Sequence, residues 1–389
     1  MLKFVAAALA VLLVSGASVA AIAVWQLQDQ LDTVAIPSDE EGPPPHIGAF
    51  EGGFNILIVG SDTREGQGGI GGSAEDVPSE LNDVNILLHV SEDQTHATAI
   101  SFPRDLVVTI PECERENGST KGRSTEPINT AMGYGGLACV AMTVEELTDL
   151  PVQFAGLITF RGVIEMTNAI GGVPVCVTGP FEDLGVTLPE AGVYPLKGYE
   201  ALAFLRSRKG IGDGSDLTRI SSQQVYLSSL VRTLKSSDTL NDWTKVYGLA
   251  QAATQNMTLS EGLGNVDTLV SIALALKDIP LEKVTFVQYP GSTSGSGVYA
   301  GKVQPIESLA NRLMEKIRAD EPFRLEQAGD GRGAEVNPNA PDVATPTPTG
   351  TTPTGTSSPT GTPSNSPEPE VIENLRGQTA ADYTCSITR

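Results

Sequence analysis

The chain begins with an uncharged stretch at residues 4–24, FVAAALAVLLVSGASVAAIAV. About 20 apolar residues are enough for a helix to cross the hydrocarbon core of a bilayer. Lys3 precedes the stretch and acidic residues such as Asp29 and Asp32 follow it, so the positive-inside bias places the N-terminus in the cytoplasm. We therefore predict a single-pass plasma-membrane protein, with a transmembrane anchor over residues 1–25 and the remainder of the chain outside the cytoplasm.

A cleaved signal peptide is the alternative interpretation of the same stretch. Ala21-Ile22-Ala23 has the small-x-small form of a cleavage site. The uncharged run is longer than the roughly 7–15 residues of a usual signal-peptide core, which favours the anchor. Both interpretations export the rest of the chain.

Charge excludes one large class of function. The 389 residues carry 25 Lys and Arg against 47 Asp and Glu, a formal net charge of −22. Phosphate backbones repel such a chain unless its few cations are clustered, so general nucleic-acid binding is excluded. Only three His are present, which disfavours a His-based zinc site or proton relay.

The four cysteines are widely spaced and no CxxC pair occurs, which excludes a zinc ribbon. Outside the cytoplasm an even number of cysteines indicates disulfides, and four allow three pairings. We favour Cys113 with Cys139, because these two flank one loop-rich insert. Cys385 suggests that the end of the chain docks back on the body through a disulfide; a free, disordered terminus is the alternative.

Composition divides the exported part into four segments. Residues 26–53 are acidic, contain Pro43–Pro45 and lack periodicity, which predicts a stalk. Residues 54–323 have the patterning of a folded domain. Residues 324–370 are rich in Pro, Thr, Ser and Gly, which predicts a disordered, extended linker. A short tail follows at 371–389.

Strand-type and helix-type patterns alternate through the folded segment, which predicts a layered α/β domain. The predicted strands are 55–60, 84–90, 97–102, 152–159, 173–177 and 284–287. The predicted helices are 142–150, 163–170, 199–205, 217–234, 243–254, 266–276 and 305–317.

Carboxylates and one arginine follow the first strands. Asp62 lies just after the first strand, and Asp83 lies just before the second. If these strands are antiparallel neighbours, the two carboxylates share one edge, and the third strand returns Arg104 and Asp105 to it. Mg²⁺ prefers oxygen ligands, often one or two carboxylates completed by water and phosphate. This edge is therefore a candidate site for a divalent cation with a phosphorylated ligand.

A second polar cluster lies about a hundred residues further on, in FLRSRKGIGDGSDLTRISSQQ. Arg206 and Arg208 would share one face of an extended segment. Asp216, Arg219 and Gln223 fall on one face of the following helix, with Asp216 at a capping position. Arginine suits bidentate recognition of phosphate oxygens. The alternative is that these arginines are solvated or paired with surface acids, and that Asp216 is only a cap.

Several dispersed motifs together resemble the LytR-CpsA-Psr family over roughly residues 54–231. They are GSDTR at 60–64, NDVN at 82–85, SFPRDL at 101–106, INTAM at 128–132, GGVPV at 171–175 and the stretch from KGYEALAFLRSR to SDLTRISSQQ at 197–224. The resemblance implies a three-layer α/β/α sandwich with a mixed central sheet and an apolar cavity for a polyprenyl tail. It also implies an extracytoplasmic phosphotransferase of Gram-positive cell walls, which moves a glycopolymer from a polyprenyl-pyrophosphate carrier to peptidoglycan. The polymer would be a teichoic acid, a capsule or an arabinogalactan.

The resemblance also assigns roles to residues. Asp62 and Asp83 match the metal-binding aspartates, which would hold Mg²⁺ or Mn²⁺. The pyrophosphate-holding positions are matched by Arg104, Arg206, Arg208, Arg219 and Gln223. The catalytic set would be Asp62, Asp83, Arg104, Asp216 and Arg219, with Asp216 or Asp105 as candidate proton acceptor.

Three positions depart from the family pattern, each by the loss of a cation: Leu81, Pro127 and Ser222. Weaker phosphate binding would favour the alternative that this is a non-catalytic protein that binds lipid phosphate or the cell wall. A polyprenyl-pyrophosphate hydrolase, with water as acceptor, is the enzymatic alternative.

Overall fold

The computed structural model describes residues 32–37, 52–64, 67–70, 72, 80–115, 117–236, 252–253, 255–264, 266–337 and 368–389. The predicted transmembrane anchor, most of the predicted linker and most of the predicted helix at 243–254 lie outside these residues. Among the described residues no helix has the length and apolar character needed to cross a membrane.

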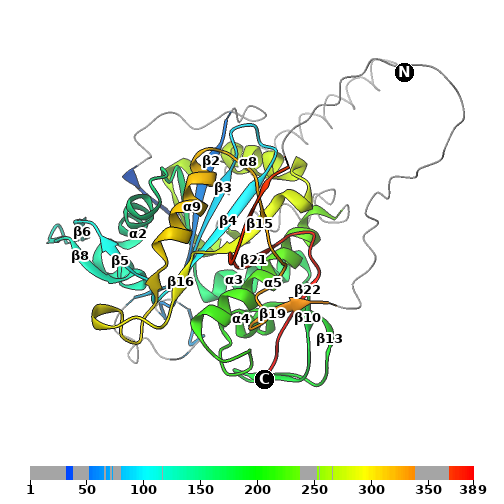
Figure 1. Cartoon of the computed structure of the whole chain (residues 1–389). Helices are drawn as coiled ribbons and strands as arrows, with labels where there is room; N and C mark the ends of the chain where they lie inside the picture. Colours follow the sequence, from blue (N-terminus) through cyan, green and yellow to red (C-terminus); the bar gives the residue numbers. More distant parts are fainter. Residues whose placement is uncertain are drawn as a thin grey trace, which may run out of the picture.

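A mixed sheet of eight strands forms the centre of the described part of the chain (Figure 1). Its order is β1-β14-β9-β2-β3-β4-β15-β21. β2, β3 and β4 are antiparallel neighbours, as the sequence predicted, whereas β9 lies parallel to β2 and β15 parallel to β4. The strands are β1 (Asp32–Val34), β2 (Phe54–Ser61), β3 (Asn82–Val90), β4 (Ala97–Phe102), β9 (Phe154–Ile158), β14 (Met257–Ser260), β15 (Val284–Gln288) and β21 (Gly377–Thr379).

Helices cover both faces of this sheet, because alternate strand residues point to opposite faces. Leu57 and Leu87 pack on the side of α2 and α9. Ile56 and Ile86 pack on the side of α5 and α8. The bounds of these helices are α2 Met132–Thr148, α9 Glu307–Arg318, α5 Asp216–Lys235 and α8 Val266–Asp278.

A second sheet of four strands, in the order β13-β10-β22-β19, packs against α4 and α5. Its core includes Val175, Phe204 and Tyr226. The strands are β10 (Val173–Val177), β13 (Gly192–Leu196), β19 (Ala334–Val336) and β22 (Thr384–Ser386), and α4 is Gly198–Arg206.

Short elements connect these layers. They are β5 (Val107–Ile110), β6 (Cys113–Glu114), β7 (Thr120–Lys121), β8 (Ser124–Pro127), α3 (Phe160–Ile170), β11 (Phe181–Asp183), β12 (Val186–Leu188), β16 (Gly291–Ser292), β17 (Gln304–Pro305), β18 (Phe323–Leu325), β20 (Glu370–Ile372), and the 3₁₀ turns Ile128–Thr130, Glu261–Leu263, Leu281–Lys283 and Gly297–Tyr299.

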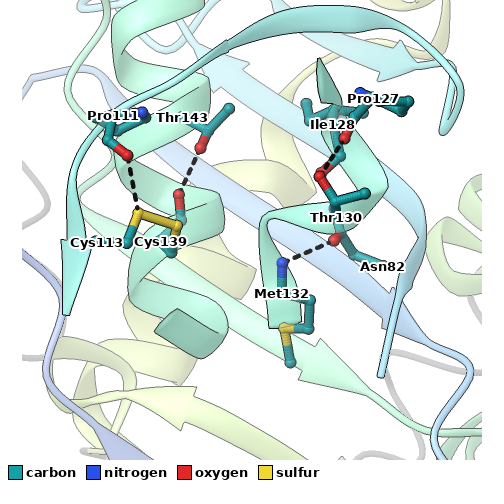
Figure 2. The surroundings of a disulfide bond; sticks show 9 residues. All are labelled: Asn82, Pro111, Cys113, Pro127, Ile128, Thr130, Met132, Cys139 and Thr143. Atoms are coloured by element: carbon teal, nitrogen blue, oxygen red, sulfur yellow. Dashed lines mark hydrogen bonds between the residues drawn. A yellow bond between two sulfur atoms is a disulfide. The ribbon is translucent and has the colours of Figure 1, made fainter. Parts of the chain in front are cut away.

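Two disulfides join elements that are separate in sequence. Cys113 of β6 is bonded to Cys139 of α2, with an S–S distance of 2.03 Å and 26 residues between the two positions (Figure 2). Cys176 of β10 is bonded to Cys385 of β22, across 209 residues. The second bond fastens the C-terminal segment, residues 368–389, to the body of the domain.

The predicted segment boundaries are wrong at both ends of the domain. The predicted stalk contains β1, which pairs with β14, and Ile36, which is buried in the core. The predicted linker begins too early, because β18 and β19 lie within 323–336. Short strands of three residues carry too little alternation to be detected by periodicity.

The predicted helix at 142–150 is too short, because α2 begins at Met132. Two glycines interrupt it: Gly135 and Gly136 have non-helical backbone angles, and φ of Gly136 is +61°. A Cβ at Gly135 would lie 3.1 Å from the Cβ of Cys113 and 2.7 Å from the Glu114 carbonyl oxygen. Gly135 therefore permits the close approach of α2 to β6 at which the first disulfide forms. Because glycine is unfavourable inside a helix, it also made the first turn of α2 hard to predict from the sequence.

Candidate functional site

Asp62 and Asp83 lie at the sheet edge where β2 ends and β3 begins. The Asp62 amide donates to the Leu81 carbonyl at 3.1 Å, and the Leu81 amide donates to Asp62 Oδ1 at 2.9 Å. Burial raises the pKa of the Asp62 carboxyl; the Leu81 hydrogen bond opposes this, and the nearby Asp83 carboxylate adds to the rise. The two carboxylates are thus close enough to repel one another.

Buried Asn82 fixes the start of β3. Its side chain accepts a hydrogen bond from the Met132 amide at 3.1 Å and donates to the Ile128 carbonyl at 3.1 Å (Figure 2). Because Asn82 is fully buried, these bonds satisfy polar groups that water cannot reach. They hold the adjacent Asp83 at the edge and tie it to the beginning of α2.

Arg104 connects this edge to helix α5. It lies two residues after β4, and its Nη1 is 2.7 Å from Asp83 Oδ1. Its backbone amide donates to Asp216 Oδ2 at 3.1 Å. A charge-assisted bond of this kind is about twice as strong as a neutral one. Arg104 therefore joins the carboxylates of the sheet to the second predicted cluster.

Asp216 contacts two arginines of that second cluster. Its Oδ1 lies 2.7 Å from Arg219 Nη2 and 3.2 Å from Arg208 Nη2. The Asp216 and Arg219 side chains are only 7% and 6% exposed, so the pair is buried. Asp216 is the first residue of α5 rather than its cap, because the Ser215 hydroxyl accepts from the Thr218 amide at 3.3 Å.

Arg219 completes the connection, because its Nη2 also donates to the Asp83 carbonyl at 3.0 Å. Burial lowers the pKa of the Arg219 guanidinium, and the Asp216 carboxylate opposes that shift. The Nε atoms of Arg104 and Arg219 are both buried and have no hydrogen-bond acceptor among the described residues. The geometry unites five predicted residues, which we call the arginine–aspartate centre: Asp83, Arg104, Arg208, Asp216 and Arg219.

Arg206 and Arg208 do not share one face of an extended segment, as predicted. Arg206 is the last residue of α4, so only the chain after it is extended. Its guanidinium carbon lies 4.0 Å from the centroid of the Phe160 ring, whereas Arg208 points to Asp216. Burial lowers the pKa of Arg206, and the positive charge of Arg64 adds to this shift.

Asp183 shapes the turn that separates these two arginines. Its Oδ2 accepts from the Ser207 hydroxyl at 2.8 Å and from the amides of Arg208 and Lys209 at 3.0 and 2.9 Å. Burial alone would raise the pKa of Asp183, but these hydrogen bonds outweigh it and hold the pKa below its ordinary value. The carboxylate therefore orients the backbone that presents Arg208.

Gln223 is buried on α5 and donates from Nε2 to the Leu205 carbonyl at 2.8 Å. This bond ties α5 to the last turn of α4. The amide group of Gln223 is thus bonded to the residue that precedes Arg206.

Three further residues of this region were not singled out from the sequence. Arg64 lies 5.7 Å from the Phe160 ring centroid, on the same ring as Arg206. Lys302 Nζ lies 2.8 Å from Asp105 Oδ1. Arg64 belongs to the motif GSDTR, two residues after Asp62, so the sequence could have identified it. Phe160 and Lys302 lie in no motif that points to the site.

One departure from the family pattern has a local explanation. Ser222 is buried, and its hydroxyl lies 2.7 Å from the hydroxyl of Ser386 in β22. A long cation at this position would meet the C-terminal segment. Nothing in the structure explains Leu81 or Pro127 in the same way.

No group of three or more His, Cys, Asp or Glu side chains suited to a metal occurs in the described part of the chain. A cation at Asp62 and Asp83 would therefore need further ligands from water or phosphate. Mg²⁺ commonly binds through one or two carboxylates with such ligands. A divalent cation would relieve the repulsion from Asp83 that adds to the rise in the Asp62 pKa caused by burial. The residues present fit Mg²⁺.

Together these features define a mixed α/β domain with a partly buried arginine–aspartate centre at one edge of its central sheet, a class of site suited to phosphate groups. A family model described as the LytR_cpsA_psr family matches residues 28–315. The chain belongs to this family.

Two curated relatives are similar to most of this chain. The chain is 28% identical over 323 residues to "Cell wall biosynthesis protein LcpA" of Corynebacterium glutamicum, covering 76% of this chain and 61% of that protein. It is 27% identical over 329 residues to "Polyisoprenyl-teichoic acid--peptidoglycan teichoic acid transferase TagT" of Bacillus subtilis, covering 81% and 94%. The chain thus spans less than two thirds of LcpA.

Solved structures show the same fold. The "LytR-Csp2A-Psr enzyme from Actinomyces oris" superposes with a TM-score of 0.55 at 20% identity, covering 74% of this chain and 95% of that one. Bacillus subtilis TagT superposes with a TM-score of 0.51 at 20% identity, covering 74% and 99%. The central mixed sheet predicted from the sequence is confirmed.

Proposed function

We propose that this protein is an extracytoplasmic phosphotransferase that moves a glycopolymer from a polyprenyl-pyrophosphate carrier to peptidoglycan. The observation that carries the proposal is the arginine–aspartate centre, which gathers three arginines at one point of a chain with a net charge of −22. Positive charge concentrated against such a background attracts an anion. The relatives named for cell-wall biosynthesis and teichoic acid transfer agree with this class of substrate.

The donor pyrophosphate would bind where the arginines converge. Arg104, Arg208 and Arg219 offer guanidinium donors, and Arg206 on Phe160 supplies further positive charge from α4. The unpartnered Nε atoms of Arg104 and Arg219 support an anionic ligand. Mg²⁺, held by Asp62 and Asp83, would neutralise pyrophosphate charge when bound.

In the transfer, an acceptor sugar hydroxyl attacks the phosphorus that carries the glycan. The new O–P bond joins glycan phosphate to peptidoglycan, the bond to the bridging oxygen breaks, and polyprenyl phosphate leaves. Arginines at the centre stabilise the charge on that leaving group.

The hydroxyl proton needs an acceptor, and the two candidates differ in their surroundings. Asp216 accepts from two guanidinium groups and one backbone amide, so its oxygens are occupied. Asp105 is paired with Lys302 at 2.8 Å and lies 3.8 Å from Arg104. We therefore assign proton acceptance to Asp105, with Asp216 as the residue that orders the arginines.

The proposed location outside the cytoplasm rests on the N-terminal part of the chain. The uncharged run at residues 4–24 would anchor the protein in the plasma membrane, with the domain facing the cell wall. From there the domain would reach both a membrane-borne polyprenyl donor and nascent peptidoglycan.

The test uses the chain from residue 26 to its C-terminus, so that β1 is kept. It is mixed with a labelled polyprenyl-pyrophosphate glycan, nascent peptidoglycan and Mg²⁺. Label should enter peptidoglycan, and EDTA or Asp62→Asn should reduce the rate on the order of 10²-fold or more. Glu190→Gln, at an exposed residue, is the matched control and should transfer at the wild-type rate.

Two outcomes would contradict the proposal. Release of the phosphorylated glycan into solution without label in peptidoglycan would indicate a hydrolase. Donor binding with no turnover, beside an acceptor shown to work with another transferase, would indicate a binding protein.

A further inference from the structure

A polar cavity of about 780 Å³ lies outside the arginine–aspartate centre. Its walls come from the end of β15, the first turns of α9, the chain at 326–332 and residues 373–376 of the C-terminal segment. Figure 1 labels β15, α9 and β21, the elements of this part of the molecule. The C-terminal segment thus supplies one wall of the cavity.

Polar groups without partners face this cavity. Gln288 is 4% exposed, and its Oε1 is buried with no hydrogen-bond donor among the described residues. Arg332 and Arg376 also line the cavity, and neither guanidinium group forms an ion pair or hydrogen bond within the described chain. A buried polar atom without a partner carries a desolvation penalty that a ligand can remove.

The other charged residues that line the cavity are Arg312, Glu326, Asp330 and Glu373. Asp330 accepts from the Ser221 hydroxyl and from the amides of Arg332, Gly333 and Ala334. Arg312 is paired with Glu370. Besides the carboxylates of Glu326 and Glu373, the cavity therefore offers two guanidinium groups, which suit carboxylates, and one amide oxygen, which needs a hydroxyl or N–H donor.

The cavity adjoins the arginine–aspartate centre along one edge of the sheet. β15 lies parallel to β4, and Gln288, the last residue of β15, is paired with Ser101 of β4, three residues before Arg104. The Tyr289 amide donates to the Ser101 carbonyl at 2.9 Å, and the Tyr289 and Phe102 ring centroids are 5.2 Å apart. The cavity and Arg104 therefore lie at the same end of the central sheet.

We propose that this cavity binds the acceptor, through the carboxylates and hydroxyl or amide groups of a muramyl peptide unit of peptidoglycan. The inference rests on the proposed function. Arg332 and Arg376 would hold carboxylates, while Gln288 would accept from a sugar hydroxyl or a peptide N–H. The polar walls exclude the polyprenyl chain, which needs an apolar surface.

The first test measures binding of a soluble disaccharide–peptide muropeptide to the chain from residue 26 by calorimetry. Arg376→Gln and Arg332→Gln should each weaken binding about tenfold, because each removes a charge-assisted hydrogen bond. Arg123→Gln is the matched control, because Arg123 is exposed and pairs with Glu146 on a different surface. Unchanged affinity in both cavity variants, with unchanged thermal unfolding, would overturn the assignment.

The second test separates the acceptor from the glycan of the donor, which can carry the same groups. In transfer assays the cavity variants should raise the acceptor KM about tenfold and leave the donor KM unchanged. A rise in the donor KM alone would overturn the assignment and place the donor glycan in the cavity. If the wild-type chain transfers nothing yet binds muropeptide through Arg332 and Arg376, the proposed function fails and the cavity assignment stands.

Discussion

The two sheets of this domain are built in different ways. The middle of the central sheet comes from β2, β3 and β4, which follow one another in the chain and pair as antiparallel neighbours. The second sheet needs β22, from the end of the chain, between β10 and β19. The middle of the central sheet is therefore local in sequence although its outer strands are not, and the second sheet closes only when the C-terminal segment has returned.

The candidate site depends on both sheets. Asp83 and Arg104 are held by the central sheet. The loop that carries Arg208 rests on the C-terminal segment: the Gly212 amide donates to the Ile387 carbonyl at 2.9 Å, and the Arg389 amide donates to the Gly210 carbonyl at 3.2 Å. The comparison teaches that the part of the arginine–aspartate centre that carries Arg208 relies on contacts between residues more than 170 positions apart in the chain.

The largest effect is expected from removing the disulfide that closes the second sheet. The Cys176→Ala/Cys385→Ala double variant should lose about 5 kcal/mol of unfolding free energy, because the bond closes a loop across 209 residues. The Cys113→Ala/Cys139→Ala double variant is the control, and its loss should be about 2 kcal/mol smaller, for a loop of 26 residues. Denaturant unfolding measures both. Equal losses would contradict the dependence on loop length.

The next largest effect is expected at Asp216, which joins the two halves of the site. Asp216→Asn leaves buried Arg219 without its counter-charge, so we expect a loss of roughly 3–5 kcal/mol in unfolding free energy. Transfer activity should fall as well, because Arg104 and Arg208 lose a common partner.

Glu335→Gln, at an exposed residue of β19, is the control for Asp216→Asn. Denaturant unfolding and donor binding are the two measurements. An Asp216→Asn variant as stable as the wild type would show that Asp216 does not stabilise the arginine–aspartate centre.

The sequence predicted the central sheet better than the second one, for a physical reason. The segments that became β2, β3 and β4 have long apolar runs bounded by turn residues, so the strands themselves were predictable. The shared edge of Asp62, Asp83 and Arg104 was expected on the condition that these strands pair as antiparallel neighbours, and the structure meets that condition. β1, β21 and β22 have three residues each, and only tertiary contacts define them.

The same limit applies to the candidate site. Helical spacing was enough to place Asp216, Arg219 and Gln223 on one helix. The divergence of Arg206 from Arg208 was not predictable, because it depends on the end of α4 and on the Phe160 ring, which comes from α3. Cysteine spacing alone also left the pairing of Cys176 open.

A smaller effect is expected where α5 meets the C-terminal segment. Ser222→Ala leaves the buried Ser386 hydroxyl without its partner, which should reduce the unfolding free energy by about 1–3 kcal/mol. The Ser222→Ala/Ser386→Ala double variant removes both hydroxyls and should be less unstable than the sum of the two single variants. Additive losses in denaturant unfolding would show that the two serines do not interact.

The smallest effect is expected at Asp183, and it should depend on pH. The hydrogen bonds from Ser207, Arg208 and Lys209 hold the pKa of folded Asp183 below its ordinary value. Such a group adds stability that is fully present above the unfolded pKa, near ~3.9, and is lost as the pH falls through the lower folded pKa. Asp183→Asn should therefore be less stable than the wild type at pH 7, by about 1 kcal/mol or less.

The difference between the two proteins should stay constant from pH 7 to about 5 and shrink below about 4, where the wild-type carboxylate becomes protonated. Thermal unfolding across this range measures it, with Glu182→Gln, the exposed neighbour in β11, as the control. A difference that persists unchanged to pH 3 would assign the effect to the shape of the side chain. A difference that shrinks would show that a charge on β11 steadies the turn of Arg208, so that the half of the site built far from the central sheet is ordered by electrostatics as well as by the C-terminal segment.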